Sequence, residues 1–138
     1  MSNQVVPALK SDWKGMWELE KRCFLPVDVF KPRQIRYILN SKTCKSFVIR
    51  EGNQILGSII GLIRMFRVPS GRVYKVAVDP RLRGKGCASK LILRMEKTFR
   101  ELGLKKSCAE VRVSNVASRN LFSKNGYRTG QTLPRYYA

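Results

Sequence analysis

A short basic turn with two glycines is the first feature of the sequence that could do chemistry. Gly84 and Gly86 stand among cations in the stretch DPRLRGKGCASKL, residues 79–91, where an alternating apolar pattern gives way to a helical one. A glycine turn that opens a helix exposes several backbone N–H groups, and the helix dipole adds about half a positive charge there. Such a turn binds phosphate without needing a particular side chain, so the stretch predicts a phosphate site.

Three phosphate-binding motifs can be compared with this turn. The spacing GxxxxGK[ST] of P-loop proteins is absent, and GxGxxG fails because Ser89 stands where the third glycine belongs. A dinucleotide-binding fold also needs a longer chain and places its glycine turn after the first strand. The third spacing, [R/Q]xxGx[G/A], is satisfied by Arg83, Gly86 and Ala88.

Several other kinds of chemistry are excluded by composition. The chain contains no histidine, which removes Ser-His-Asp and Cys-His nucleophilic machinery. Its four cysteines, at 23, 44, 87 and 108, form no CxxC pair, so we expect reduced thiols and no metal site. Acids are scarce as well, and Glu110 is one of only nine.

The net charge of +19 is the strongest compositional signal. It favours a polyanionic ligand or neighbour, either a nucleotide cofactor, ribosomal RNA or both, although a solvated basic surface without a specific partner gives the same composition. No apolar stretch approaches the ~20 residues that span a bilayer, and the N-terminus lacks the pattern of a signal peptide. We therefore expect a cytoplasmic protein that does not associate with membranes.

The elements that must position the turn follow from hydrophobic periodicity. We expect one domain over residues 1–138, built on a mixed α/β or α+β sheet. Strands are predicted at 3–8, 46–50, 54–63, 72–78, 107–113 and from Tyr127, and helices at 11–22, 32–39, 85–102 and 116–125. The apolar face of the third helix is predicted to comprise Ala88, Leu91, Ile92, Met95, Phe99 and Leu102, with Gly103 ending the helix.

Two stretches in this context resemble the GNAT superfamily of N-acetyltransferases. YKVAVDPRLRGKGCASKLI, residues 74–92, is similar to the family's fourth strand, pyrophosphate loop and third helix. AEVRVSNVASRNLFSKNGY, residues 109–127, is similar to its fifth strand and fourth helix. The resemblance is greatest to the bacterial ribosomal-protein alanine acetyltransferases, which acetylate protein N-termini. It implies three layers, with a central, mostly antiparallel sheet between helices, and acetyl-CoA as the acyl donor without a metal.

The resemblance also implies roles for individual residues. The strand backbone at Val76, Ala77 and Val78 is expected to hold the pantetheine arm and thioester. Glu110 is expected to act as the general base, directly or through water. The pyrophosphate and coenzyme contacts are expected from Arg83, Gly84, Lys85, Gly86, Cys87, Ala88, Ser89 and Asn115. The acceptor groove is expected to include Phe24, Leu25, Tyr136 and Tyr137.

Two positions depart from the family pattern. Phe122 stands where the family carries a tyrosine as general acid for the leaving thiolate, and Tyr127, Tyr136 or water could substitute for it. The family's last strand, which lies beside the fifth, has no counterpart before the sequence ends at RYYA, residues 135–138. We therefore expect the edge of the fifth strand to be unpaired, in a shortened chain or one completed by a strand from another chain.

Three functions remain open from the sequence. The first is acetylation of a protein N-terminal α-amine, with a ribosomal protein as one candidate acceptor. Deprotonation of an α-amine at pH 7 costs about 1 kcal/mol, compared with about 4.6 kcal/mol for a lysine. The second is acetylation of a small amine or polyamine, which the scarcity of acids disfavours. The third is a basic RNA- or ribosome-associated module with the same fold and weak catalysis.

Overall fold

The computed structural model describes residues 4–65, 67–110, 116–127 and 136–137. The order of elements is the predicted one: strand, two helices, three strands, helix, strand, helix and strand. The elements are β1 (Val5–Pro7), α1 (Trp13–Cys23), α2 (Pro32–Asn40), β2 (Cys44–Glu51), β3 (Gln54–Arg64), β4 (Ser70–Val78), α3 (Cys87–Glu101), β5 (Lys106–Glu110), α4 (Val116–Lys124) and β6 (Tyr136–Tyr137).

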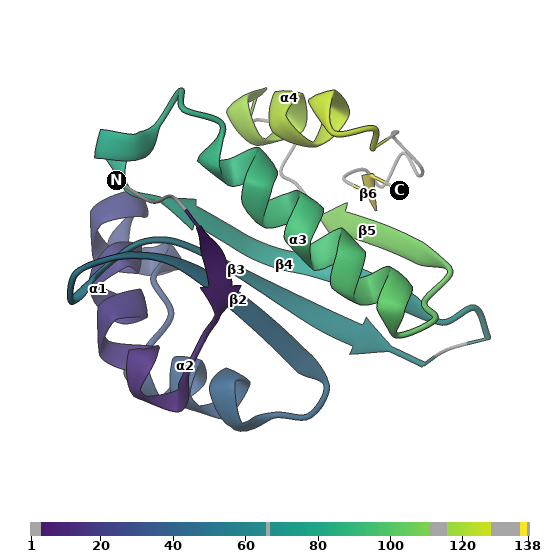
Figure 1. Cartoon of the computed structure of the whole chain (residues 1–138), viewed down its shortest axis with the longest axis horizontal. Helices are drawn as coiled ribbons and strands as arrows, with labels where there is room; N and C mark the ends of the chain where they lie inside the picture. Colours follow the sequence, from purple (N-terminus) through teal and green to yellow (C-terminus); the bar gives the residue numbers. More distant parts are fainter. Residues whose placement is uncertain (1–3, 66, 111–115, 128–135, 138) are drawn as a thin grey trace.

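The strands form one sheet in the order β1-β2-β3-β4-β5-β6. Every neighbouring pair is antiparallel except β4 and β5, which are parallel and are joined by the crossover through α3. Figure 1 shows α1 and α2 against one face of the sheet and α3 and α4 against the other. The predicted three-layer fold with a mostly antiparallel sheet is confirmed.

Each face of the sheet has its own apolar core. Beneath α3 and α4, the core includes Leu91, Met95, Phe99 and Phe122, and on the other face it includes Met16, Leu19, Ile35 and Ile60. α3 approaches β4 closely because Gly71 has no side chain: a Cβ there would lie 2.4 Å from ring atoms of Phe99. The sheet is therefore buried on both sides around β3 and β4, the strands that carry the candidate site.

α3 differs from its prediction at both ends. It begins at Cys87 rather than at residue 85, because Gly84 and Gly86 adopt positive φ angles that no helix contains. Leu102, predicted in the core, is 47% exposed because the helix ends at Glu101 and the chain turns there. Gly103 has φ +78°, which fits its predicted role in ending the helix.

The C-terminal part of the sheet corrects the expectation of an unpaired fifth strand. β6 pairs antiparallel with β5, with Ala109 opposite Tyr137 and Glu110 opposite Tyr136. Tyr127 itself lies outside any strand, and the rest of the strand predicted to begin there, residues 128–135, lies outside the described residues, as do residues 111–113 of the predicted fifth strand.

β4 contains an irregularity in its pairing with β3. Ile60 lies opposite Lys75, but the next residue, Gly61, lies opposite Val73, so Tyr74 is an extra residue in the ladder. Bulges of this kind bend a strand, redirect its side chains and are frequent beside active sites. On its other side, β4 pairs with β5 up to Val73 opposite Ala109, directly before the bulge.

Candidate functional site

The glycine turn after β4 has an open, positively polarised surface. Gly84 has φ +78° and Gly86 has φ +76°, and a Cβ built on either glycine would meet no atom within 4 Å. No side chain caps α3, and the hydrogen bond from the Lys90 N–H to the Gly86 carbonyl, at 3.1 Å, closes the helix's first turn. The helix N–H groups that precede Lys90 have no intrahelical acceptor, so they are available to an anion.

The side chains of the turn divide into exposed cations and packed small groups. Arg83 and Lys85 are exposed, whereas Ala88 and Ser89 are half-buried. Cys87 is buried in the core, so only its backbone can reach a ligand. On the α4 side, Asn125 donates from its amide nitrogen to the Ser89 hydroxyl at 3.1 Å.

The register of β4 determines which backbone groups face away from β3. Asp79 donates its N–H to the Leu56 carbonyl at 2.8 Å, so Gly57 and Val78 form a non-hydrogen-bonded pair. The alternation of the ladder turns the backbone groups of Ala77 toward β3, and those of Val76 and Val78 away from it, toward the β5 side. Of the three residues predicted to hold the pantetheine, Val76 and Val78 are the ones with backbone groups on that side.

The predicted base lies level with the β4 bulge. Glu110 ends β5, one residue after the last β4–β5 pair, Val73 with Ala109, and lies opposite Tyr136 of β6. The side chains of Glu110, Tyr136 and Tyr137 lie outside what the structure describes. Asn115, predicted to touch the coenzyme, belongs to a stretch that is outside the described residues altogether.

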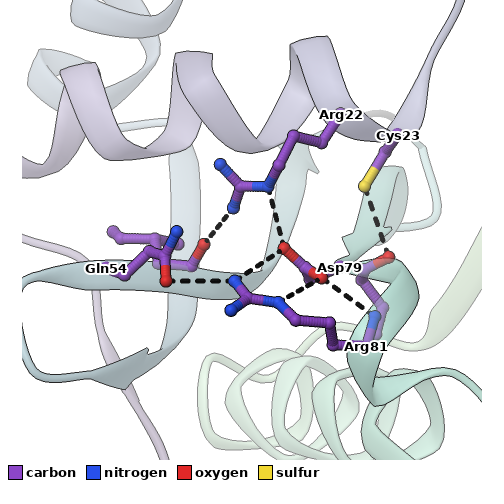
Figure 2. Close-up of polar contacts among 7 residues, drawn as sticks. Arg22, Cys23, Gln54, Asp79 and Arg81 are labelled. Atoms are coloured by element: carbon purple, nitrogen blue, oxygen red, sulfur yellow. Dashed lines mark hydrogen bonds and ion pairs between the residues drawn. The ribbon is translucent and has the colours of Figure 1, made fainter.

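A buried carboxylate, Asp79, joins the end of β4 to α1 (Figure 2). Arg22 of α1 donates to it through Nε at 2.8 Å and also reaches the Ile55 carbonyl of β3 at 2.9 Å. Arg81 approaches Asp79 from the opposite side, donating from its backbone N–H at 2.9 Å and from Nε at 3.1 Å. The carboxylate therefore fixes the direction in which the chain leaves β4 and enters the glycine turn.

Electrostatics at this joint favour the ionised carboxylate. The hydrogen bond from the Arg81 guanidinium, supported by the Arg81 N–H and Arg22, holds the pKa of Asp79 well below its usual range despite burial. Cys23, the last residue of α1, donates its thiol to the Val78 carbonyl at 3.3 Å. Burial raises the pKa of Cys23, and the neighbouring guanidinium of Arg83 opposes that shift.

On the α1 side of β4, the residues before the glycine turn meet the loop that follows α1. Lys75 donates to Glu20 Oε1 at 2.7 Å and lies over the rings of Phe24 and Phe30, at 4.4 and 3.8 Å from their centroids. The ring of Phe30 also contacts the bulge residue Tyr74, with a centroid distance of 5.4 Å. Of the predicted groove residues, Phe24 is thus half-buried against β4.

The tip of this loop is apolar and open to solvent. Leu25 is 69% exposed and Val27 is 86% exposed, in and beside the short 3₁₀ turn Pro26–Asp28. Two large apolar side chains are therefore exposed close together at the tip of the loop.

The structure separates Tyr127 from the predicted reaction centre. Its hydroxyl shares a hydrogen bond with Ser107, near the start of β5. At about 3.3 Å per residue along a strand, this position is roughly 10 Å from Glu110. Phe122 packs edge-on against the Tyr127 ring, with centroids 5.1 Å apart. The Tyr127 hydroxyl is therefore held at the Ser107 end of β5, away from the end that carries Glu110.

Sequence reasoning missed Asp79, Glu20 and Lys75. A signal was present for each, because these ionisable residues interrupt or directly follow apolar patterns, where a charge needs a buried partner. What the sequence could not supply was the identity of the partners, since Arg22 and Asp79 are 57 residues apart and so not recognisable as a pair.

Two absences hold for the described part of the chain. It contains no group of three or more side chains that could hold a metal ion. None of the helices described there is long and apolar enough to cross a membrane.

Comparison with known proteins identifies one family. Residues 13–127 match the model of the acetyltransferase (GNAT) family. The chain is 34% identical over 125 residues to the L-2,4-diaminobutyric acid acetyltransferase of Wolinella succinogenes, an alignment that covers 87% of this chain and 69% of that protein.

Several solved structures of acetyltransferases share this fold. An aminoglycoside N-acetyltransferase in complex with CoA superimposes with a TM-score of 0.81 at 18% identity, over 93% of this chain and 89% of that one. The ribosomal-protein-alanine N-acetyltransferase of Brucella melitensis gives a TM-score of 0.77 at 15% identity, over 94% of each chain. At these identities the likeness establishes the fold.

Proposed function

The chain belongs to the GNAT acetyltransferase family and uses acetyl-CoA as its acyl donor, and from this premise we propose that it acetylates the α-amine of a protein N-terminus. The observation that carries the proposal is the glycine turn, whose open surface and uncapped helix end suit a diphosphate. The loop after α1 supports the acceptor class.

The residues of the turn fit the coenzyme's pyrophosphate. Gly84 and Gly86 leave free the volume that a Cβ would occupy, so phosphate oxygens can approach the backbone closely. The N–H groups that open α3 supply hydrogen-bond donors, and exposed Arg83 and Lys85 add positive charge. When bound, acetyl-CoA supplies the activated acetyl group.

The remaining residues would bind and activate the amine. The backbone N–H groups of Val76 and Val78, which face away from β3, would hold the acyl arm and the thioester oxygen. Glu110 would take the proton from the amine, directly or through water. Because an α-amine needs only about 1 kcal/mol to become neutral at pH 7, a single carboxylate is a sufficient base.

The acceptor side of the site favours a peptide over a polycation. The loop tip presents apolar Leu25 and Val27, which suit the side chains of an extended peptide. Two buried carboxylates lie nearby, but Glu20 is paired with Lys75, and Asp79 with Arg22 and Arg81. Neither is open to a second ammonium group, which a polyamine or aminoglycoside would bring.

Release of CoA thiol from acetyl-CoA tests the proposal. Peptides with free N-termini and apolar first residues are expected to give turnover, while the same peptides already acetylated at the N-terminus give none. Glu110→Gln is expected to lower kcat by 10²- to 10⁴-fold, the usual contribution of a positioned base, while acetyl-CoA binding is unchanged. Turnover confined to lysine side chains or small amines would contradict the N-terminal assignment.

A second acceptor class is favoured by the relative from Wolinella succinogenes, whose name assigns it 2,4-diaminobutyrate. The same thiol-release assay with 2,4-diaminobutyrate decides between the two classes. A kcat/KM for this diamine above that for every peptide would replace the first assignment with the second.

The net charge of +19 supports a third property, proximity to RNA. Filter binding of a ribosomal RNA fragment over a salt series measures it. A steep fall in affinity with salt is expected if phosphates are contacted, whereas weak, salt-independent retention would remove RNA from the proposal.

A further inference from the structure

The ammonium of Lys75 is held as a ligand would be held. It donates to Glu20 Oε1 at 2.7 Å and to the Asp28 carbonyl, and it lies 3.8 Å from the centroid of the Phe30 ring and 4.4 Å from that of Phe24. Only 14% of the Lys75 side chain and 3% of the Glu20 side chain are exposed. We call the set Glu20, Phe24, Asp28 and Phe30 the ammonium box.

The composition of the ammonium box is one that recognises amines in general. A carboxylate and a carbonyl accept N–H bonds, and aromatic faces attract a partly desolvated cation. The box is also anchored independently of Lys75, because Glu20 Oε1 accepts the Phe30 N–H at 2.7 Å. Removal of the lysine side chain would therefore leave acceptors and rings in place around an empty position.

The box lies beside the acceptor end of β4. Lys75 directly precedes Val76, whose backbone faces the proposed position of the thioester, and follows the bulge residue Tyr74, which is level with Glu110. The box walls belong to the same loop that presents the exposed side chains Leu25 and Val27. The exclusion proposed below requires that an amine acceptor at the site lie within a short alkyl chain of the Lys75 ammonium.

We propose that Lys75 is a specificity-determining residue: its ammonium fills the ammonium box and thereby excludes acceptors that carry a second ammonium group. The inference rests on the proposed amine acetylation and names the acceptors that the site rejects. A diamine meets a box whose volume is already filled, whereas a monoamine or a peptide N-terminus brings no second ammonium group to that position.

Matched acceptors and matched variants test the exclusion. 1,4-Diaminobutane and n-butylamine share a carbon chain and differ in one ammonium group, so the ratio of their kcat/KM values isolates its effect. In Lys75→Ala we expect this ratio to rise at least tenfold, through a lower KM for the diamine. In Lys75→Ala/Glu20→Gln, which also lacks the carboxylate, we expect the ratio to return to within threefold of wild type.

Lys75→Met separates charge from volume, because methionine removes the ammonium but still fills the box. It is expected to raise the ratio less than threefold, and it keeps the test decisive should Lys75→Ala not fold under assay conditions. An unchanged ratio in Lys75→Ala overturns the proposal. If Lys75→Ala is unfolded, a rise of tenfold or more in Lys75→Met overturns it instead, because exclusion would then depend on charge alone.

A binding measurement tests the ammonium box without any turnover. n-Propylammonium replaces the part of the side chain that Lys75→Ala removes, and n-propanol is its uncharged control. We expect n-propylammonium to raise the Tm of Lys75→Ala by several degrees, with no such rise for wild type, for Lys75→Ala/Glu20→Gln or with n-propanol.

This arm separates two failures. If the wild type acetylates no amine but n-propylammonium still stabilises Lys75→Ala, the box exists and the proposed function is wrong. If peptides are acetylated but n-propylammonium stabilises every variant equally or none, the proposed function stands and the assignment of Lys75 is wrong.

Discussion

Substitution of Gly86 by alanine should separate the stability of the fold from its affinity for acetyl-CoA. Gly86 has φ +76°, where an L-residue costs about 1–2 kcal/mol, and the loss of glycine's freedom in the unfolded chain returns about 0.4–1 kcal/mol. No steric term is added, because a Cβ there meets no atom within 4 Å. Gly86→Ala is therefore expected to destabilise the protein by about 1 kcal/mol, or about 4 °C in Tm.

The effect on coenzyme binding should be larger. The new methyl group projects into the space above the α3 N-terminus where we propose that the diphosphate binds, and one lost charge-assisted hydrogen bond is worth about 1.5–3 kcal/mol. The Kd for acetyl-CoA, measured by isothermal titration calorimetry, is therefore expected to rise roughly ten- to hundredfold. Gly84→Ala, at φ +78° and equally open, should behave in the same way.

Gly103 provides the matched control. It has φ +78° and no atom within 4 Å of a built Cβ, but it lies at the opposite end of α3. Gly103→Ala is expected to lose the same Tm and none of the affinity. Equal Kd values for Gly86→Ala and Gly103→Ala would refute the reasoning, because the glycine turn would then have no special relation to the coenzyme.

Three further predictions concern the fold around the site. Gly71→Ala places a Cβ 2.4 Å from the Phe99 ring, so urea unfolding should show a loss of about 3 kcal/mol, and a loss below 1 kcal/mol would mean that α3 does not pack as described. The folded-state pKa of Asp79 lies below its ordinary value of 3.8, so its contribution to stability is complete above that pH and is lost as the pH falls further. Asp79→Asn should therefore lower the free energy of unfolding by about 2 kcal/mol at pH 7 and weaken its decrease at acid pH. An equally steep decrease at acid pH in the variant would contradict this assignment. Burial raises the pKa of Tyr127 above its ordinary value of 10, so absorbance titration should find one phenol that ionises at higher pH than the rest. The contribution of the neutral phenol to stability is complete below pH 10 and is lost as the pH rises further. Tyr127→Phe should cost about 1 kcal/mol and leave kcat unchanged, whereas a large fall in kcat would return Tyr127 to the list of general acids.

The site's main chain could be predicted from the sequence, and its side-chain partners could not. Gly84 and Gly86 indicated an exposed turn because glycine is the residue that occupies positive φ without strain, and the structure gives both that conformation. The same property explains the error in the start of α3, since a helical pattern of apolar residues carries no information about the φ of the residues before it. Leu102 was wrongly assigned to the apolar face of the helix for a related reason. The apolar periodicity of the sequence continues past Glu101, where the helix ends.

Long-range ion pairs are the second class of feature that pattern reasoning missed. Lys75 and Glu20 are 55 residues apart, and their contact depends on how α1 crosses β4. The bulge at Tyr74 was likewise invisible, because a strand with one extra residue has almost the same alternation as a regular one. Both features arise from tertiary packing rather than from local propensity.

The joint at Asp79 has a consequence for how the two substrates affect each other's binding. Arg22 and Cys23 end α1 and hold Asp79 and Val78, while the loop that carries Leu25 begins at the next residue. The loop that we propose meets the amine and the turn that we propose meets the nucleotide are thus both attached to this one set of contacts. If bound acetyl-CoA raises the affinity for the amine by some factor, the bound amine must raise the affinity for acetyl-CoA by the same factor, because the two binding equilibria are linked.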